Sequence, residues 1–295
     1  MRRREVRWDR MFPDELEAAV EACPVVYLPY GLCEPHGPQN ALGMDALRPT
    51  RILRRVAEIF GGIVAPPEYW HCHESGGYGS WAHPRVGQAR PWLTAVPPWV
   101  FLKNLCYHIR AVDALGFHAA VLFSGHAGPH SHDVPRVIET MQGHISTRLY
   151  CLIGSGTSQS RFDEDKGMGS HAGRGETSLL WAVAPECVDI SRMPKPDQPP
   201  PHFAMGEYVA ESSRSVGEHM VADIVNALVD KAGELLAEYD DSVPRKPSLT
   251  FGEVEAVWDD EIRPVFKDFA SMQSSGDEPP EDSRWHRNWR LPDIH

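Results

Sequence analysis

Along most of the chain, short apolar runs alternate with longer stretches in which apolar residues recur every three or four positions. The short runs are rich in Val, Ile and Leu and are followed closely by Gly or Pro, which is typical of buried parallel strands. The longer stretches have the period of amphipathic helices. The predicted strands are 24–31, 61–67, 118–123 and 148–153, and the predicted helices are 16–23, 48–60, 99–115, 133–142, 177–184 and 216–239.

The order of these elements predicts the fold class, because strands that alternate with helices form right-handed βαβ crossovers. We therefore expect an α/β fold in which helices cover both faces of a mostly parallel sheet. After residue 241 the pattern changes to Pro, acidic residues and several Trp with little periodicity. The predicted organisation is one domain over 1–241 and a C-terminal arm over 242–295. The arm contains Trp258, Trp285 and Trp289, which suggest that it docks on another surface, because free linkers are normally poor in aromatic residues.

Charge and composition narrow the classes of function. The 29 Lys and Arg against 41 Asp and Glu give the 295-residue chain a net charge of −12, which argues against a nucleic-acid partner. No apolar window approaches the roughly 18 residues that a membrane span requires. The 6 Cys include no CxxC pair, so a zinc ribbon and a disulfide framework are not expected, and the economical prediction is a cytoplasmic enzyme.

Candidate chemistry follows the predicted strands. In an open parallel sheet, ligands bind at the carboxyl ends of the strands, and glycines there let the backbone approach a bound group. Glu34 and His36 are separated by one residue, so both side chains leave the same side of an extended segment. The acidic and imidazole side chains that follow the strands are those of Glu34, His36, Asp45, His126, His171 and Glu176.

These side chains predict a metal site. Three carboxylates and two or three imidazoles without a thiolate suit Zn²⁺, Mn²⁺ or Fe²⁺. Five protein ligands exceed what one catalytic ion with an open position needs, whereas two ions that share a carboxylate would use them all. Two ions about 3.5–4 Å apart would hold a hydroxide nucleophile and polarise the carbonyl that it attacks.

Three runs carry a family resemblance: LPYGLCEPHGPQNALGMDA, FSGHAGP and GSHAGRGETS. In order and spacing they resemble the three signatures of the creatininase (creatinine amidohydrolase) superfamily, over about residues 24–184. The resemblance implies a three-layer αβα sandwich, a homo-oligomer such as a hexamer, and hydrolysis of an amide bond with two divalent metal ions. By motif match it implies the metal ligands Glu34, His36, Asp45, His126 and Glu176, with Asp45 as the bridge, and the catalytic histidine His171.

The chain departs from the family pattern at the second signature. Creatininase has a ligating Glu two residues after the histidine, where this chain has Gly128, so the resemblance implies that Glu176 takes that place. The two Asn residues that flank this signature in the family are replaced here by Ser124 and Pro129. We therefore expect a substrate different from those of the better-known family members. The segment 70–83 also departs, and its aromatic and His side chains are typical of a substrate loop. The expected substrate contacts are Tyr78, Trp81, His83 and Gly128.

Alternatives remain for each residue and for the activity. Glu34 could cap a helix, Asp45 could be an N-cap, and a lone His is more often structural. His130 and His132 are expected to cap the following helix or to stay solvated. The set favours a metal site over structural roles, and with it the creatininase resemblance implies a hydrolase of a non-peptide or cyclic amide, with a small-molecule substrate. The same metals could instead serve hydrolysis of a cyclic ketone, a lactone or a short peptide, and a third hypothesis is a metal-binding protein without catalysis.

Overall fold

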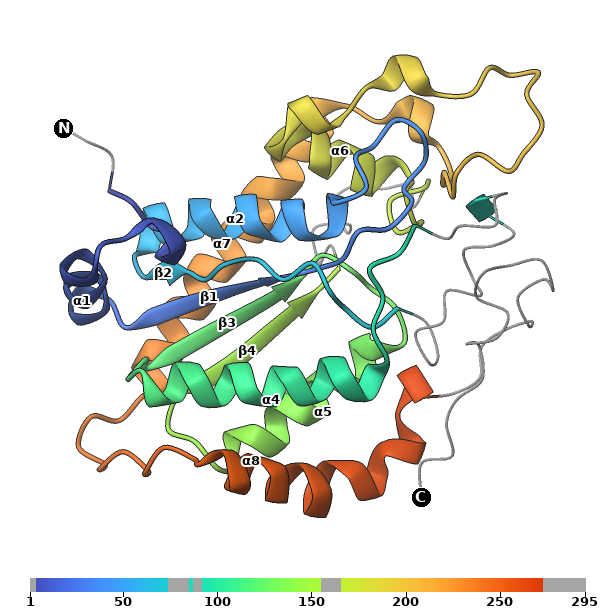
Figure 1. Ribbon diagram of the computed structural model, residues 1–295. Coiled ribbons are helices and arrows are strands. Elements are labelled where there is room, and N and C mark those ends of the chain that lie inside the picture. The colour runs from blue at the N-terminus through green and yellow to red at the C-terminus, as the bar shows by residue number, and fades with distance from the viewer. Residues whose placement is uncertain (1–3, 74–84, 87–91, 155–165, 273–295) are drawn as a thin grey trace.

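The computed structural model describes residues 4–73, 85–86, 92–154 and 166–272, and within them the fold is built on a parallel sheet (Figure 1). Its strands are β1 (Val25–Tyr30), β2 (Ile63–Val64), β3 (Ala119–Ser124) and β4 (Arg148–Ile153), in the order β2-β1-β3-β4. Every residue of β1 and β3 is buried, as the apolar runs predicted.

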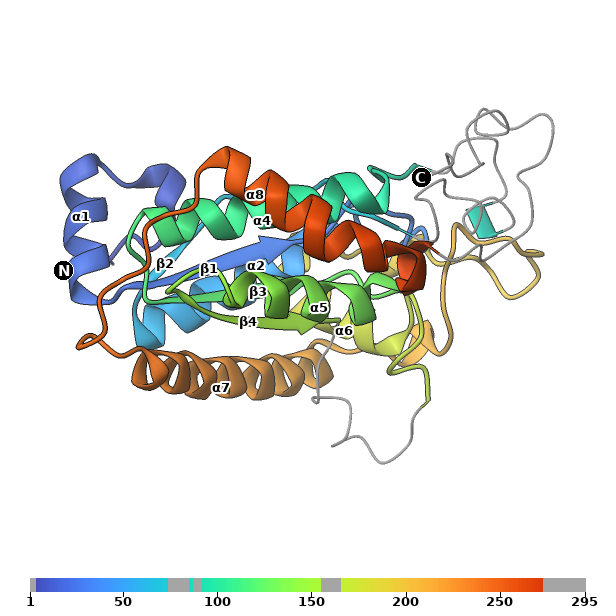
Figure 2. The ribbon, with the colours of Figure 1, turned by 90° about the horizontal axis from the view of Figure 1, so that it is seen from below.

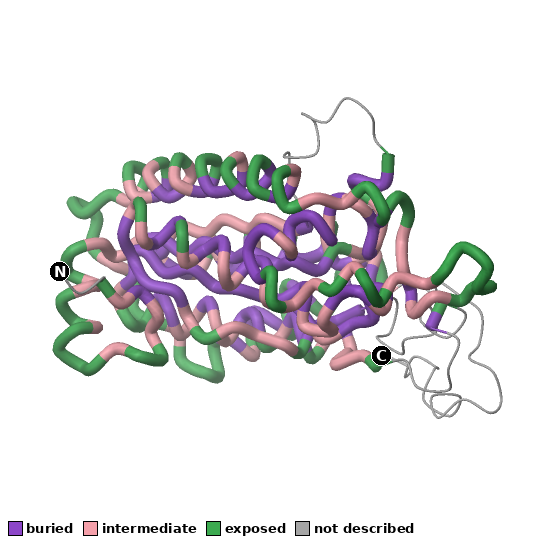
Figure 3. The backbone as a smooth tube through the Cα atoms, turned by 90° about the horizontal axis from the view of Figure 1, so that it is seen from above, coloured by how far each residue is buried: buried purple, intermediate pink, exposed green. Residues whose placement is uncertain are grey.

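Helices cover both faces of this sheet (Figures 1 and 2). One face packs on α2 (Met44–Phe60), α6 (Arg174–Val183) and α7 (Arg214–Glu238), and the other on α4 (Pro98–Ala114) and α5 (His130–Gln142), with α8 (Phe251–Val257) packed outside them. Side chains alternate along each strand, so Tyr27 enters the first core and Val26 the second. The α/β fold with helices on both faces is confirmed, and Figure 3 shows its buried centre.

The chain after α7 returns along the outside of α4 and α5 (Figure 2). Helix α8 continues into a π-helical turn (Trp258–Ile262) and a 3₁₀ helix (Arg263–Asp268). Trp258 is 6% exposed and Phe266 is 3% exposed, and both belong to the core cluster on the side of the sheet that α4 and α5 cover. This part of the predicted arm therefore packs on its own chain. Trp285 and Trp289 lie outside the described residues, and the boundary at residue 241 stays a prediction.

The helices begin one to four residues earlier than the sequence predicted, and in α2 and α6 the earlier start places a candidate metal ligand in the first turn. Helix α2 begins at Met44 instead of residue 48, with Gly43 as its N-cap, so Asp45 is a helical residue and not the cap. Helix α6 begins at Arg174, so Glu176 lies in its first turn. The short helix α1 (Pro13–Ala22) lies at the end of the sheet where β1 begins, away from Asp45 and Glu176 (Figure 1). Across the described ranges, no helix is both long and apolar enough to span a bilayer.

Candidate metal centre

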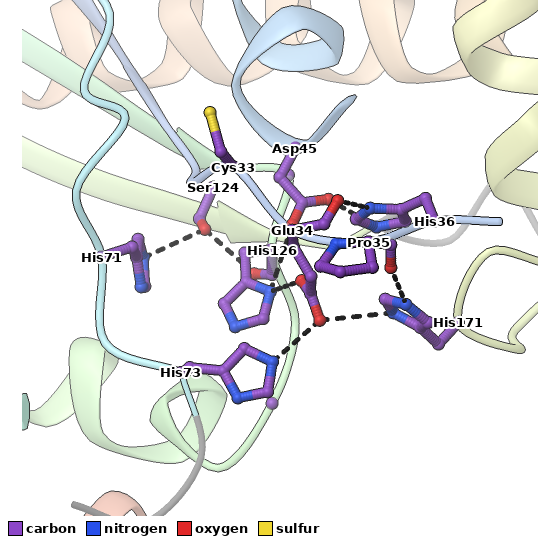
Figure 4. Close-up of polar contacts among 12 residues, drawn as sticks. Cys33, Glu34, Pro35, His36, Asp45, His71, His73, Ser124, His126 and His171 are labelled. Carbon is purple, nitrogen blue, oxygen red and sulfur yellow. Dashed lines mark hydrogen bonds and ion pairs between the residues drawn. The ribbon is translucent and has the colours of Figure 1, made fainter. Parts of the chain in front are cut away.

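The carboxyl ends of β1 and β3 point to one cluster of acidic and imidazole side chains (Figure 4). The loop after β1, the loop after β3 and the first turns of α2 and α6 each contribute to it. The sequence-predicted residues that lie together here are Glu34, His36, Asp45, His126, His171 and Glu176.

Two glycines allow α2 to begin this close to the strand ends. A Cβ atom on Gly31 would lie 2.3 Å from the Asp45 carbonyl carbon, and one on Gly125 would lie 2.1 Å from the Asp45 carbonyl oxygen. Both distances are far shorter than van der Waals contact, so a side chain at either position would push the helix away. The backbone of Asp45 therefore reaches the sheet edge because both neighbours lack a side chain.

The two carboxylate oxygens of Asp45 face different partners. Oδ1 lies 3.2 Å from His36 Nε2, and Oδ2 lies 3.3 Å from His126 Nδ1. On the Oδ2 side, Glu34 Oε2 is 3.1 Å from the same His126 nitrogen. On the Oδ1 side, Glu176 Oε2 is 3.7 Å from His36 Nε2. Asp45 thus stands between two groups of potential ligands.

Arg48 neutralises part of this acidic cluster. Its Nη2 donates to Asp45 Oδ1 at 2.9 Å, to Glu176 Oε1 at 2.9 Å and to the Gly125 carbonyl at 2.8 Å. The side chain is 2% exposed, so these bonds lie in a low-dielectric interior where a charge needs a partner. Arg48 ties the first turn of α2 to the first turn of α6 and to the loop after β3.

The charges of the cluster support one another. Burial opposes ionisation of Glu34 and Asp45, but the facing imidazoles hold the pKa of each carboxyl well below its usual value. Burial likewise opposes protonation of His36 and His126, but the carboxylates raise the pKa of His36 to about 9 and that of His126 to about 10. Near neutral pH, in the absence of metal, these carboxylates are ionised and these two imidazoles carry a proton.

His171 differs from the other imidazoles of the cluster. Burial lowers its pKa, so it is neutral near pH 7. Its Nε2 lies 2.9 Å from the Pro35 carbonyl, which only accepts hydrogen bonds, so Nε2 holds the proton. Nδ1 therefore carries the lone pair and lies 3.7 Å from Glu34 Oε1. The side chain is 28% exposed and lines a cavity of about 450 Å³ together with Arg85, His202 and Met205.

The cluster fits divalent metal ions. Among the described residues, the buried atoms Glu34 Oε2, Asp45 Oδ2 and His126 Nε2 have no hydrogen-bond partner, although buried polar atoms normally have one. Oxygen and nitrogen donors without a thiolate suit Zn²⁺, Mn²⁺ or Fe²⁺. Groups of three potential ligands whose donor atoms lie within 4.8 Å of one another include Glu34–His73–His126 and His36–Asp45–Glu176.

Comparison with known families agrees with this geometry. The sequence model of the family Creatininase, described as creatinine amidohydrolase, matches residues 9–238. The chain belongs to the creatininase family. A curated creatininase relative, the creatinine amidohydrolase of Pseudomonas putida, is 27% identical over 241 residues, which cover 76% of this chain and 88% of the relative.

Solved creatininase structures have the same fold. The structure titled "Creatininase Mn" aligns with a TM-score of 0.60 at 25% identity and covers 80% of this chain and 99% of the other. A mutant creatininase described as "Zn-Zn type" aligns with a TM-score of 0.61 at 25% identity, over 80% and 98% of the two chains. As a creatininase family member with this cluster, the chain is a metal-dependent amidohydrolase acting on a C–N bond other than a peptide bond.

Within this creatininase-family site, three residues were not predicted from the sequence. His73 Nε2 lies 2.8 Å from Glu34 Oε1, and Arg48 holds Asp45 and Glu176 as described above. His71 packs its ring edge-on to that of His126, with ring centroids 5.4 Å apart. The run Trp70–His73 (WHCH) follows β2, and the ends-of-strands rule could have assigned both histidines to the site.

One prediction is wrong and three lie outside the described residues. His130 neither caps α5 nor stays solvated: it is fully buried as the first residue of the helix, which begins three residues earlier than predicted. His132, two residues on, is exposed. The expected substrate contacts Tyr78, Trp81 and His83 are not among the described residues. Gly128 lies beside His126, as its place in the signature requires.

Proposed function

We propose that this creatininase-family chain is a dinuclear metal-dependent hydrolase of a non-peptide or cyclic amide. Glu34, His126 and Asp45 Oδ2 would hold one ion, and His36, Glu176 and Asp45 Oδ1 the other. The observation that supports two ions is that the Asp45 oxygens face separate ligand groups, at 3.3 Å from His126 Nδ1 and 3.2 Å from His36 Nε2. Zn²⁺, Mn²⁺ and Fe²⁺ are the candidate ions.

The chain's own residues divide the remaining work. Bound divalent ions supply an electrophile for the substrate carbonyl and lower the pKa of water. His171 offers a lone pair on Nδ1 while its Nε2 is fixed by the Pro35 carbonyl. It therefore accepts a proton from the attacking water and returns it to the leaving nitrogen. Arg48 holds Asp45 and Glu176 in place while the charge of the reacting group changes.

The cavity beside His171 supports a small-molecule substrate. Its volume is about 450 Å³, and its described walls include Arg85, His171 and the segment 200–206. Small-molecule sites are commonly about 300–1,000 Å³. A larger cavity of about 740 Å³ lies between α2 and α7, among residues such as Glu58 and Glu218. None of the proposed metal ligands lines it. The cavity at His171 is therefore the one we assign to substrate.

Metal removal and a substrate screen test the proposal. Dialysis against a strong chelator should abolish turnover of lactams, formamides or other non-peptide amides, and Mn²⁺ or Zn²⁺ should restore it. Full activity in demonstrably metal-free protein would contradict the proposal. Lactones and cyclic ketones belong in the same screen, because they present a carbonyl to the same centre without a C–N bond. If only lactones or cyclic ketones were turned over, the substrate class would be these compounds and not amides.

A further inference from the structure

We propose that His71, His126 and His130 form an additional three-histidine pocket that binds a borderline transition-metal ion such as Zn²⁺. It lies behind the carboxylate cluster and uses the Nε2 atom of His126, the nitrogen that faces away from Glu34 and Asp45. The inference goes beyond the proposed function and shares only His126 with it. The donor atoms of the three imidazoles lie within 4.8 Å of one another.

The spacing of the three rings fits coordination of one ion. The ring centroids are 5.4 Å apart for His71 and His126, 4.9 Å for His126 and His130, and 4.5 Å for His71 and His130. A tetrahedral ion about 2.0–2.1 Å from each nitrogen would separate the ring centroids by about 5 Å. The three side chains are at most 6% exposed, so the pocket is closed to bulk water.

Hydrogen bonds fix the lone pairs of two rings. His71 Nδ1 lies 2.7 Å from the Cys72 carbonyl, and His130 Nε2 lies 3.1 Å from the His126 carbonyl. A carbonyl only accepts, so both of these nitrogens are protonated and the lone pairs are on His71 Nε2 and His130 Nδ1. The Ser124 hydroxyl donates to the His126 carbonyl at 2.9 Å, and its oxygen lies 3.3 Å from His71 Nε2, a contact that an ion bound to this nitrogen would replace.

The third ring completes a carboxylate–histidine–metal arrangement. His126 Nδ1 faces the carboxylates of Glu34 and Asp45, and its buried Nε2 has no hydrogen-bond partner in the described part of the chain. The same holds for His130 Nδ1. Metal-binding histidines typically donate their other N–H to a carboxylate or carbonyl. His71 and His130 each bond a carbonyl in this way, and His126 Nδ1 lies 3.1 Å from Glu34 Oε2. With both sites filled, His126 would be a ligand of both, and its ring protons would pass to solvent.

The absence of a side chain at Gly128 leaves room at this position. A Cβ atom there would lie 3.5 Å from His130 Nδ1 and 3.9 Å from His126 Nε2. Three imidazoles without a carboxylate favour Zn²⁺, Cu²⁺ or Ni²⁺ over Mn²⁺, which prefers oxygen ligands. The mixed carboxylate and imidazole donors of the proposed dinuclear centre suit both Zn²⁺ and Mn²⁺. The two metals therefore distinguish the two sites.

The test counts bound ions after chelator treatment of the full chain. Equilibrium dialysis followed by elemental analysis should find about one more ion per chain with Zn²⁺ than with Mn²⁺. His71→Phe, which preserves stacking on Phe101, and His130→Gln, which preserves the bond to the His126 carbonyl, should each remove this difference. His132→Gln, an exposed neighbour on the same helix, is the matched control and should keep it.

Equal numbers of Zn²⁺ and Mn²⁺ in the wild-type protein would overturn the three-histidine pocket. So would an undiminished zinc excess in both His71→Phe and His130→Gln when circular dichroism shows native folds. These outcomes do not involve turnover. Failure of the proposed function, by contrast, would be an inactive wild-type protein with its metals bound, so the two failures are distinguishable.

Discussion

His171 is the one histidine of the described cluster that both faces the proposed metal ligands and lines the cavity that we assign to substrate. If it moves a proton, His171→Asn should lower kcat by about 10²–10⁴-fold, the usual contribution of a general acid or base. The bound metal should not change, because the substitution leaves the proposed ligands Glu34, His36, Asp45, His126 and Glu176 in place. Steady-state kinetics and elemental analysis measure both quantities. His219→Asn on the exposed face of α7 is the control, and an unchanged kcat in His171→Asn would remove the assigned role.

Arg48 carries a buried charge that two carboxylates share. Arg48→Met keeps much of the volume but leaves Asp45 and Glu176 without their cation. We expect the free energy of unfolding of the metal-free protein to fall by about 3–5 kcal/mol, as in other broken buried ion pairs. Urea titration followed by circular dichroism measures it.

Arg51 on the same helix provides the matched comparison. Its ion pair with Glu186 is exposed, 3.1 Å long, and lies at the protein surface. Arg51→Met should therefore change the free energy of unfolding by no more than about 1 kcal/mol. Equal losses of unfolding free energy in Arg48→Met and Arg51→Met would mean that burial does not determine how much the Arg48 ion pairs stabilise the fold.

At the scale of elements, the approach of α2 to β1 and β3 positions Asp45. Gly125→Ala would place a methyl group 2.1 Å from the Asp45 carbonyl oxygen, so the start of α2 must move. We expect a loss of about 1–3 kcal/mol in stability, as for other overpacked sites, and weaker metal binding by calorimetry. Gly233→Ala on α7, where the new Cβ atom would lie 3.6 Å from Phe60, should be neutral or stabilising. Native metal affinity in Gly125→Ala would contradict this account.

The elements also show how far the sequence predicts the site. Glu34, His36 and His126 follow β1 and β3 closely, and the rule for parallel sheets brings such residues to one edge. Arg48 lies three residues after Asp45 on α2, a helical spacing that predicts their contact once the earlier helix start is known. Burial of His130 was not predictable from local pattern. It depends on how the loop after β3 turns into α5, which is tertiary information.

At the scale of the whole molecule, the protonated histidines of the centre link stability to pH. The pKa of His36 is raised to about 9 and that of His126 to about 10 in the metal-free fold, above the value of about 6.5 in an unfolded chain. Their contribution to stability is therefore complete below about pH 6.5 and is lost as the pH rises through 9 to 10. Denaturant titrations of metal-free protein between these limits should show falling stability.

Bound metal should weaken this dependence. Because ligands bind as neutral imidazoles, bound metal stabilises the fold more strongly as protons are removed. Metal-loaded protein should therefore lose less stability than metal-free protein over the same alkaline range. A pH-independent stability of the metal-free chain would show that these imidazoles are not paired in solution.

The predicted homo-oligomer is a separate proposal, and analytical ultracentrifugation of the metal-loaded chain tests it.

The ion pairs of the centre have a consequence for how the protein matures. Glu34, Asp45 and Glu176 face Arg48 and two protonated histidines, His36 and His126, so positive and negative groups are matched before any metal arrives. Zinc fingers fold only around their ion. Here the chain can fold before it binds metal, and the imidazoles would then release their protons when metal ions bind. Acquisition of metal would be a late step that the cell can time separately from synthesis, and brief acidification would strip the ions reversibly while the fold persists.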